Sequence, residues 1–342
     1  MRVAALGRTH WLYDSVVALD KAGHEVVLIG TAPAAPEYRV GGKDFEQLAD
    51  RLGCSFFCDA SINRTEHVAL VRSLTAEAAI SVNWPTLIGS EMIAAFRHGI
   101  VNAHAGDLPR FRGNACPNWA ILNGENNVVL SLHQMNTDLD AGPIVLKKGL
   151  PLTESTYIGD VYRFLDRAIP EAFVEALAGM ESGSLTPTAQ SRDPAQGLRC
   201  FPRVPEDGGV DWNRPATEIA KMVRASAEPF AGAFAQLKGE RLTIWRARAE
   251  KLPYPSLGVN GQVVRLDTDR GETWILCGEG VLVLEQVEIG GKRGAATEFI
   301  RSTRTRLAAG DSVATQLQAM NSRIEALERL IGSAQGTQSN DR

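Results

Sequence analysis

VNAHAGDLPRFRGNACPNWAILNGE, residues 101–125, begins as a short apolar strand and continues into a loop stiffened by proline. Asn102 and His104 are two residues apart, and on a strand such residues point to the same face. Asn supplies an amide N–H donor, and neutral His supplies one donor and one acceptor. The pair can therefore bind a carbonyl oxygen that becomes negative under nucleophilic attack, and His104 can move a proton near neutral pH.

The residues before this stretch alternate between short apolar strands and amphipathic helices. RVAALG at 2–7 and EVVLIGT at 25–31 predict strands, and the apolar spacing over residues 9–22 predicts a helix between them. Alternation over the first 105 residues predicts the α/β class, with a Rossmann-like, mainly parallel sheet and helices on both faces. Such sheets place their sites at the carboxyl ends of strands, where Asn102 and His104 are expected.

Asp140 is the candidate third member of this site. It stands in TDLDAGPIV, after the next predicted strand, and Gly142 and Pro143 are expected to shape the turn that presents it. A carboxylate beside an imidazole fixes the orientation of the ring and favours its charged form. The alternative stays open that Asn102 and His104 only cap and satisfy a loop.

The length of 342 residues suits two domains. We expect the following division: a catalytic domain at 1–184, a linker at 185–204, a small OB-like β-barrel domain at 205–308, a helical heptad tail at 309–332 and a disordered end at 333–342. The heptad seam runs from Val313 to Ile331. It predicts either a coiled coil that joins two subunits as a homodimer or a single helix packed on its own domain.

Bulk composition excludes several classes of protein. No run of eighteen apolar residues is present, and the N-terminus lacks the apolar core of a signal peptide, so a cytoplasmic protein without membrane association is expected. Five cysteines at irregular spacing predict neither a disulfide framework nor a zinc site, and we expect no metal. The net charge of −4 disfavours broad binding to a nucleic-acid backbone.

Several spaced motifs now combine into one pattern between Val101 and Val145. They read Asn-x-His, Asp-Leu-Pro-x-x-Arg-Gly, Pro-x-Trp-Ala-Ile-x-x-Gly-Glu and Leu-Asp-x-Gly-Pro-Ile. This pattern resembles the 10-formyltetrahydrofolate-dependent formyltransferase family. Residues 202–244 resemble the second domain of methionyl-tRNA formyltransferases and of enzymes that formylate nucleotide-linked amino sugars. One departure is that Ala105, Gly106 and Asp107 follow the His, where the family often has Ser-Leu-Leu.

The resemblance implies that Asn102, His104 and Asp140 are the catalytic set. A neutral amine attacks the formyl carbon of the donor, Asn102 and His104 stabilise the oxyanion, and Asp140 orients His104. Asp140 or a water then helps to move the amine proton. No metal takes part.

The resemblance also implies a folate pocket beside the strand that precedes Asn102. The candidates for it are Asn83, Trp84, Leu87, Ile88 and Arg112. Trp84 and Leu87 can equally be ordinary core residues. Arg112, like its neighbour Arg110, suits the anionic glutamate tail of a folate.

The formyl acceptor is predicted from charge. The loop at 31–44 is neutral, and basic and acidic residues of the second domain nearly balance, so neither segment predicts a strong phosphate-binding surface. We therefore expect a nucleotide-linked amino sugar of the kind used in bacterial surface glycans, with methionyl-tRNA as the alternative. The candidate acceptor contacts are Arg8, His10, Trp11, Tyr13 and Asp107, although residues 8–13 can instead be a helix start packed on the sheet.

Four other functions are open to different degrees. Formylation of a hydroxyornithine and hydrolysis of the donor use the same three residues. A dinucleotide-binding protein is disfavoured because the first strand is not followed by Gly-x-Gly-x-x-Gly. A non-catalytic folate-binding protein is disfavoured by the intact set of Asn102, His104 and Asp140.

Overall fold

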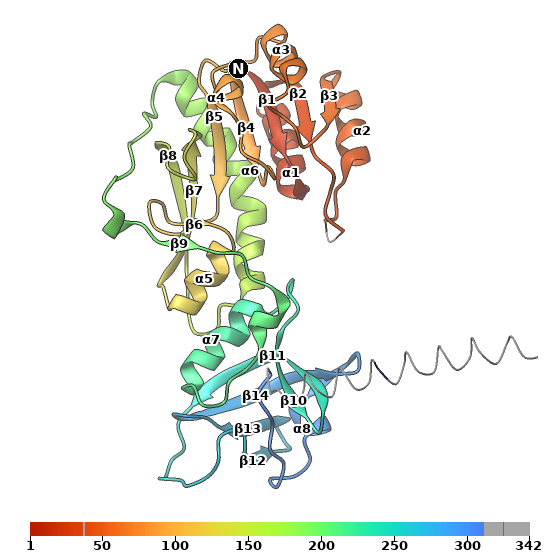
Figure 1. The fold of residues 1–342 in the computed structure, drawn as a ribbon, viewed down its shortest axis with the longest axis vertical. Helices are drawn as coiled ribbons and strands as arrows, with labels where there is room; N and C mark the ends of the chain where they lie inside the picture. Colours follow the sequence, from red (N-terminus) through yellow and green to blue (C-terminus); the bar gives the residue numbers. More distant parts are fainter. Residues whose placement is uncertain (37, 311–323, 325–342) are drawn as a thin grey trace, which may run out of the picture. The chain divides into compact units, whose positions relative to one another are not determined.

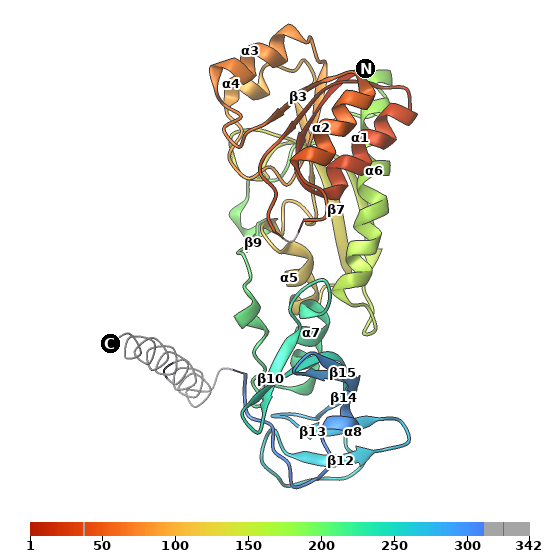
Figure 2. The same cartoon turned by 90° about the vertical axis from the view of Figure 1, so that its right-hand side faces the viewer.

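A computed structural model describes residues 1–36, 38–310 and 324 of the chain. The chain divides into two compact units (Figures 1 and 2). The first unit comprises Met1–Ser155 and Asp160–Pro202, and the second comprises Thr156–Gly159 and the residues from Arg203 onward. None of the helices in the described part is both long enough and apolar enough to cross a membrane.

The first unit is built on a seven-stranded sheet in which the first five strands pair in parallel and the strand at the seventh position runs in the same direction, while the strand at the sixth position is antiparallel to both of its neighbours. In sheet order the strands are β3 (Ser55–Cys58), β2 (Glu25–Thr31), β1 (Arg2–Gly7), β4 (Ala78–Val82), β5 (Ile100–His104), β7 (Asn127–Gln134) and β8 (Ile144–Pro151). The central strands are apolar along almost their whole length, because helices cover both faces of the sheet. The predicted α/β class with a mainly parallel sheet is confirmed.

Helices lie on both faces of this sheet (Figure 2). On one face lie α1 (Thr9–Lys21), α2 (Gly42–Leu52) and α6 (Ile158–Ser182); on the other lie α3 (Thr65–Ser73) and α4 (Ser90–Ile93). Helix α1 turns Trp11, Leu12, Val16 and Leu19 into the core, which is the apolar spacing that predicts an amphipathic helix. Helix α4 is a single turn, although the sequence from residue 91 to 99 predicts a longer helix.

Register places three polar residues in one row across the sheet. Ser81 of β4 pairs with Asn102 of β5, and Asn102 pairs on its other side with His133 of β7. Directly paired residues on neighbouring strands turn their side chains to the same face. The row lies near the carboxyl ends of β4 and β5. A parallel sheet usually holds its site at the carboxyl ends of its strands, so these polar side chains meet at the place where a site is expected.

The segment that the sequence predicts as a linker is tied to the first unit. Thr188 exchanges two backbone hydrogen bonds with Ile144. Strand β9 (Arg199–Cys200) pairs with β6 (Arg112–Gly113), in the loop that follows His104. The chain between them includes η1 (Pro194–Gln196), and α5 (Cys116–Asn123) follows β6. Residues 188–200 therefore fix the loop that holds part of the candidate site.

The second unit is an antiparallel sheet, which confirms the expected second β domain. In sheet order its strands are β10 (Ala233–Leu237), β11 (Glu240–Glu250), β14 (Val281–Ile289), β13 (Glu272–Leu276) and β12 (Val263–Asp267), with β15 (Lys292–Ala295) paired to β14. The remaining elements of this unit are η2 (Pro205–Gly208), α7 (Ala216–Ser226) and α8 (Ala296–Phe299). Arg306 forms an isolated β-bridge with Gln262, directly before β12, and Ala308 forms one with Gln236 of β10. The segment from 306 to 308 therefore links the two edge strands of the sheet.

The heptad tail predicted at 309–332 and the disordered end predicted at 333–342 lie outside the described residues, apart from positions 309, 310 and 324.

Candidate active site

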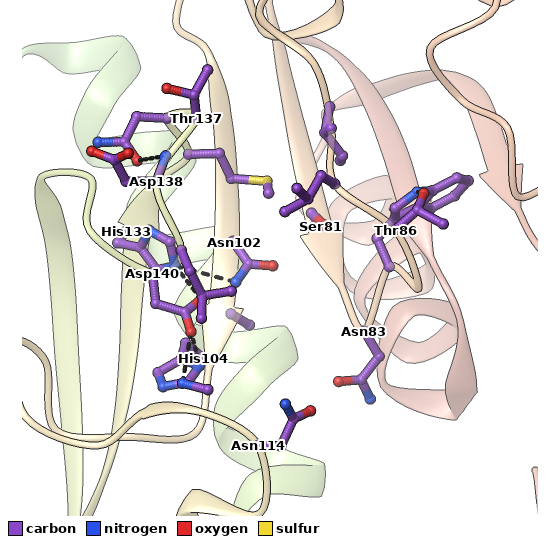
Figure 3. Close-up of a pocket in the computed structure, with 18 residues that line it drawn as sticks. Ser81, Asn83, Thr86, Asn102, His104, Asn114, His133, Thr137, Asp138 and Asp140 are labelled. Atoms are coloured by element: carbon purple, nitrogen blue, oxygen red, sulfur yellow. Dashed lines mark hydrogen bonds and ion pairs between the residues drawn. The ribbon is translucent and has the colours of Figure 1, made fainter. Parts of the chain in front are cut away.

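A cavity of about 200 Å³ opens at the carboxyl ends of β4 and β5 (Figure 3). One wall holds Ser81, Asn83 and Thr86 and belongs to β4 and the loop after it. The opposite wall holds polar side chains from β5, from β7 and from the loop between β7 and β8: Asn102, His104, His133, Asp138 and Asp140. The three residues that the sequence singles out as catalytic therefore line one wall of a single pocket.

Asp140 is held by a tight turn rather than by a strand. Its backbone is left-handed, with φ of 49°, which is uncommon for a residue other than glycine. Its Oδ2 accepts a hydrogen bond of 2.9 Å from the Gly113 N–H and lies 3.6 Å from His104 Nδ1. Gly142 allows the turn to close, because a Cβ there would lie 1.8 Å from the carbonyl oxygen of Gln134.

The hydrogen bonds of His104 fix the position of its proton. Nε2 lies 2.7 Å from the carbonyl oxygen of Phe111, which can only accept, so neutral His104 carries its proton on Nε2. Nδ1 is then unprotonated and faces the Asp140 carboxylate. Gly106 makes this arrangement possible, because a Cβ there would lie 2.5 Å from His104 Nε2 and 2.3 Å from the Phe111 oxygen.

Burial and charge set the ionisation of this pair. Burial lowers the pKa of His104 below its usual value, and the nearby Asp140 carboxylate only partly opposes the effect. Burial by itself raises the pKa of Asp140, but nearby groups, among them His104 and the Gly113 N–H, outweigh it and hold that pKa below its usual value. At neutral pH the site therefore contains a neutral imidazole beside an ionised carboxylate.

His133 belongs to the same cluster, although it is not among the residues predicted from the sequence. It is almost completely buried, with Nε2 at 3.2 Å from Asn102 Nδ2 and at 3.7 Å from Asp140 Oδ1. The available signal was a polar residue at the end of the apolar run in NVVLSLHQM. That signal becomes useful only when β7 is known to pair with β5.

Gln190 is a second site residue that was not predicted from the sequence. Its Nε2 donates to the carbonyl oxygens of Asp140 at 2.9 Å and Gly142 at 2.7 Å, and its Oε1 accepts from Arg112 at 2.8 Å. Gln190 therefore holds the turn that presents Asp140. No local sequence signal marks it, because the contact joins residues fifty positions apart.

The predicted folate residues divide into two groups. Asn83, Trp84, Leu87 and Ile88 all line the cavity. The side chain of Leu87 is 72% exposed while Ile88 is buried, and Trp84 donates to Thr86 Oγ1 at 3.0 Å. This wall offers apolar surface beside polar edges, which suits a flat heteroaromatic ring. Arg112 does not line the cavity, and its guanidinium binds Gln190.

The predicted acceptor contacts lie outside this cavity. His10 Nε2 and Trp11 Nε1 both bind Asp166 Oδ1 of α6, at 2.9 and 2.6 Å. Tyr13 packs against Phe45 of α2, with ring centroids 6.0 Å apart. These three side chains therefore hold α1 against neighbouring helices.

Arg8 and Asp107 differ in whether their charge is already paired. Asp107 accepts from Lys147 at 2.7 Å in an ion pair. Arg8 donates to the backbone oxygens of Asn83 and Pro33 and stacks over Tyr38, with the guanidinium 5.3 Å from the ring centroid. Arg8 thus brings a positive charge beside the cavity residue Asn83 without a carboxylate among these contacts.

One cluster elsewhere in the described residues has the donor types of a metal site. Ligand atoms of Asp59, Glu66 and His67 lie within 4.8 Å of one another. Arg64 Nη1 lies 3.0 Å from Asp59 Oδ2, so that carboxylate already forms an ion pair with a cationic side chain.

Comparisons with known proteins agree across both units. A family model described as "Formyl transferase" matches residues 1–177, and a model described as "Formyl transferase, C-terminal domain" matches residues 203–304. A methionyl-tRNA formyltransferase from Anaeromyxobacter dehalogenans is 31% identical over 299 residues, covering 85% of this chain and 93% of the relative. One from Sinorhizobium medicae is 29% identical, covering 91% and 99%.

Solved structures show the same fold at low identity. WlaRD, a sugar 3N-formyl transferase solved with dTDP and 5-N-formyl-THF, has a TM-score of 0.62 at 13% identity and covers 85% of this chain and 98% of its own. An N-formyltransferase from Helicobacter canadensis, solved with folinic acid and dTDP-3-aminofucose, has a TM-score of 0.61 at 13% identity, covering 84% and 100%.

Proposed function

The chain belongs to the formyl transferase family and uses 10-formyltetrahydrofolate as its formyl donor, and from that premise we propose that Asn102, His104 and Asp140 transfer the formyl group to the primary amine of a nucleotide-linked amino sugar. The observation that carries the assignment of these three residues is their convergence, from two strands and a turn, on one wall of the cavity.

The donor supplies the formyl carbon that the neutral acceptor amine attacks. Asn102 Nδ2–H donates to the formyl oxygen as that oxygen gains negative charge. His104 Nδ1, unprotonated at neutral pH, accepts the amine proton. Asp140, 3.6 Å away, stabilises the imidazolium that results. The proton then passes to the departing nitrogen of tetrahydrofolate, so the C–N bond that breaks is replaced by the C–N bond that forms.

The folate fits the wall formed by Asn83, Trp84, Leu87 and Ile88. Leu87 supplies exposed apolar surface for a flat ring. Asn83 has φ of 53°, a left-handed conformation that turns the chain at the end of β4 beside the cavity. Arg112 is not part of this proposal, because Gln190 already binds its guanidinium.

Charge around the cavity supports a small acceptor. A polyanion such as tRNA is gripped by several free cations, since each phosphate contact needs one. Arg110 is paired bidentately with Glu125, at 2.9 and 3.2 Å, and Lys147 with Asp107. Arg8 contacts backbone oxygens and an aromatic ring. A single guanidinium of this kind suits the diphosphate of a nucleotide sugar.

Methionyl-tRNA is the second candidate acceptor, and a different observation favours it. The methionyl-tRNA formyltransferases from Anaeromyxobacter dehalogenans and Sinorhizobium medicae match this chain over both domains at 29–31% identity. The sugar formyltransferase structures share only 13% identity with it, so they speak for the fold and not for the acceptor.

A direct competition tests the acceptor. Full-length protein with 10-formyltetrahydrofolate is offered UDP- and dTDP-linked amino sugars in one series and methionyl-tRNA in another, with formate release followed in the absence of amine. We expect one sugar nucleotide to be formylated and the tRNA not. Formylation of the tRNA alone would overturn the sugar acceptor, and formate release without any amine would indicate a hydrolase. Asn102→Ala serves as the inactive control in every series.

A further inference from the structure

Asn102 has a side chain whose two ends differ in chemistry, so its catalytic use depends on which end faces the formyl oxygen. The NH₂ end donates hydrogen bonds and the oxygen end accepts them. An amide turned the wrong way would present an acceptor to a developing oxyanion and would repel it. Something in the site must therefore fix the rotation of this carboxamide.

We propose that His133 is the positioning residue that fixes the Asn102 carboxamide with its NH₂ group available to the formyl oxygen, an inference that rests on the proposed function. His133 pairs directly with Asn102 across β5 and β7, and its Nε2 lies 3.2 Å from Asn102 Nδ2. The imidazole is 2% exposed, and it lines the cavity together with Asn102.

The proton on His133 decides the direction of that hydrogen bond. Nδ1 lies 3.0 Å from the backbone oxygen of Gln134, which can only accept. Neutral His133 therefore carries its proton on Nδ1 and has an unprotonated Nε2. An unprotonated nitrogen accepts, so the end of Asn102 that faces it must be the NH₂ group. One N–H of Asn102 is used in this way, and the second remains for the ligand.

Other polar groups near this contact lie farther away. Asp140 Oδ1 lies 3.7 Å from His133 Nε2, whereas Asn102 Nδ2 lies 3.2 Å from it, so the shorter contact of Nε2 is the one to Asn102. The ring of His104 packs edge-on with centroids 6.4 Å apart. On the other side of Asn102 stands Ser81, whose buried Oγ has no hydrogen-bond partner and lines the cavity. Among these neighbours, His133 is the group that hydrogen-bonds to the Asn102 side chain.

The first test is a pair of variants at position 133. His133→Leu removes the acceptor and keeps a bulky apolar side chain, whereas His133→Gln can return an acceptor oxygen near the position of Nε2. We expect His133→Leu to lower kcat about 10- to 100-fold, which is less than the roughly 100- to 1000-fold cost of removing an oxyanion donor outright, with the folate Kd within about twofold of wild type. His133→Gln should recover much of that loss. Wild-type kcat in His133→Leu, or equal losses in both variants, would overturn the proposal.

A double-mutant cycle separates positioning from general disruption. If His133 acts through Asn102, adding His133→Leu to Asn102→Ala should lower kcat no further. If the kcat losses of the two single variants multiply in the double variant, the proposal is overturned.

Different results refute the proposed function and the role of His133. An active Asn102→Ala single variant would refute the proposed function, whereas an inactive Asn102→Ala with an active His133→Leu would refute only the role of His133.

A measurement on the unmodified protein covers the case in which His133→Leu does not fold. Long-range ¹H–¹⁵N NMR of the histidine-labelled full chain distinguishes the two neutral tautomers. We expect His133 with its proton on Nδ1. A proton on Nε2, or a doubly protonated ring at pH 7, would mean that the oxygen of Asn102 faces His133 and would overturn the inference.

Discussion

Two groups of polar residues follow strands of the same sheet, and they are used in different ways. Asn102 and His104 end β5 and meet Asp140 at a cavity. His10 and Trp11 follow β1 and meet Asp166 of α6 outside that cavity. Each group pairs an imidazole with a carboxylate, but only the first does so where a ligand can enter. A polar residue that follows a strand is therefore a candidate site residue only when it lines a cavity that a ligand can enter.

The difference arises from the element that carries each group. Residues two apart on a strand point the same way, so Asn102 and His104 stay together as far as the strand runs. Residues 10 and 11 already belong to α1, which begins at Thr9 directly after β1. Successive side chains on a helix diverge by about 100°, and the packing of α1 on α6 decides where they go.

The largest expected effect tests the first group. We expect Asn102→Ala and His104→Ala each to lower turnover by at least about 100-fold, because each removes a group that acts on the transition state. Folate affinity should stay within about twofold, since the folate wall lies across the cavity. Steady-state kinetics and a folate titration on the same samples check both statements. Turnover near the wild-type rate would remove the residue from the catalytic set.

The next largest effect is expected for the group around Asp166, and it concerns stability and not turnover. Trp11 is 9% exposed, and Trp11→Ala leaves a cavity between α1 and α6. The expected cost is about 3–5 kcal/mol in the free energy of unfolding, measured by denaturant titration. The kcat of the folded protein should not change. A lower kcat in samples shown to be folded would instead place Trp11 in the catalytic machinery.

A third prediction concerns the ionisation of His104. Burial lowers its pKa below the ordinary value of about 6.5, so the ring is neutral at pH 7 and becomes protonated only under more acid conditions. Activity that needs a neutral Nδ1 should therefore be maintained from pH 7 down to the ordinary histidine value of about 6.5 and fall only under more acid conditions. A profile of kcat/KM that has already fallen by half at or above about pH 6.5 would contradict this.

The smallest expected effect concerns the ion pair between Lys147 and Asp107. Both side chains are partly exposed, and such pairs contribute about 0–1 kcal/mol. Lys147→Ala should therefore lower the free energy of unfolding by no more than about that amount, measured by denaturant titration. A loss of several kcal/mol would show that the second contact of Lys147, to the backbone oxygen of Leu108, holds the loop after His104.

Much of the fold followed from local signals in the sequence. The order of strands and helices depends on apolar periodicity, and the placement of Asn102 and His104 at a strand end depends on the two-residue repeat. His133 could not be identified in this way, because its role depends on antiparallel pairing between β5 and β7, thirty-one residues apart. Gln190 depends on a segment that returns to the Asp140 turn from beyond α6. Contacts of this kind are set by tertiary structure and leave no periodic trace.

The most direct test of this comparison neutralises one carboxylate in each group. Asp140→Asn and Asp166→Asn make the same chemical change beside His104 and beside His10. Turnover, folate affinity and the melting temperature are measured for both variants with the acceptor found in the competition. We expect a loss of at least about 100-fold in turnover for Asp140→Asn with folate affinity retained, and wild-type turnover for Asp166→Asn. Equal turnover in the two variants, whether both active or both inactive, would contradict it.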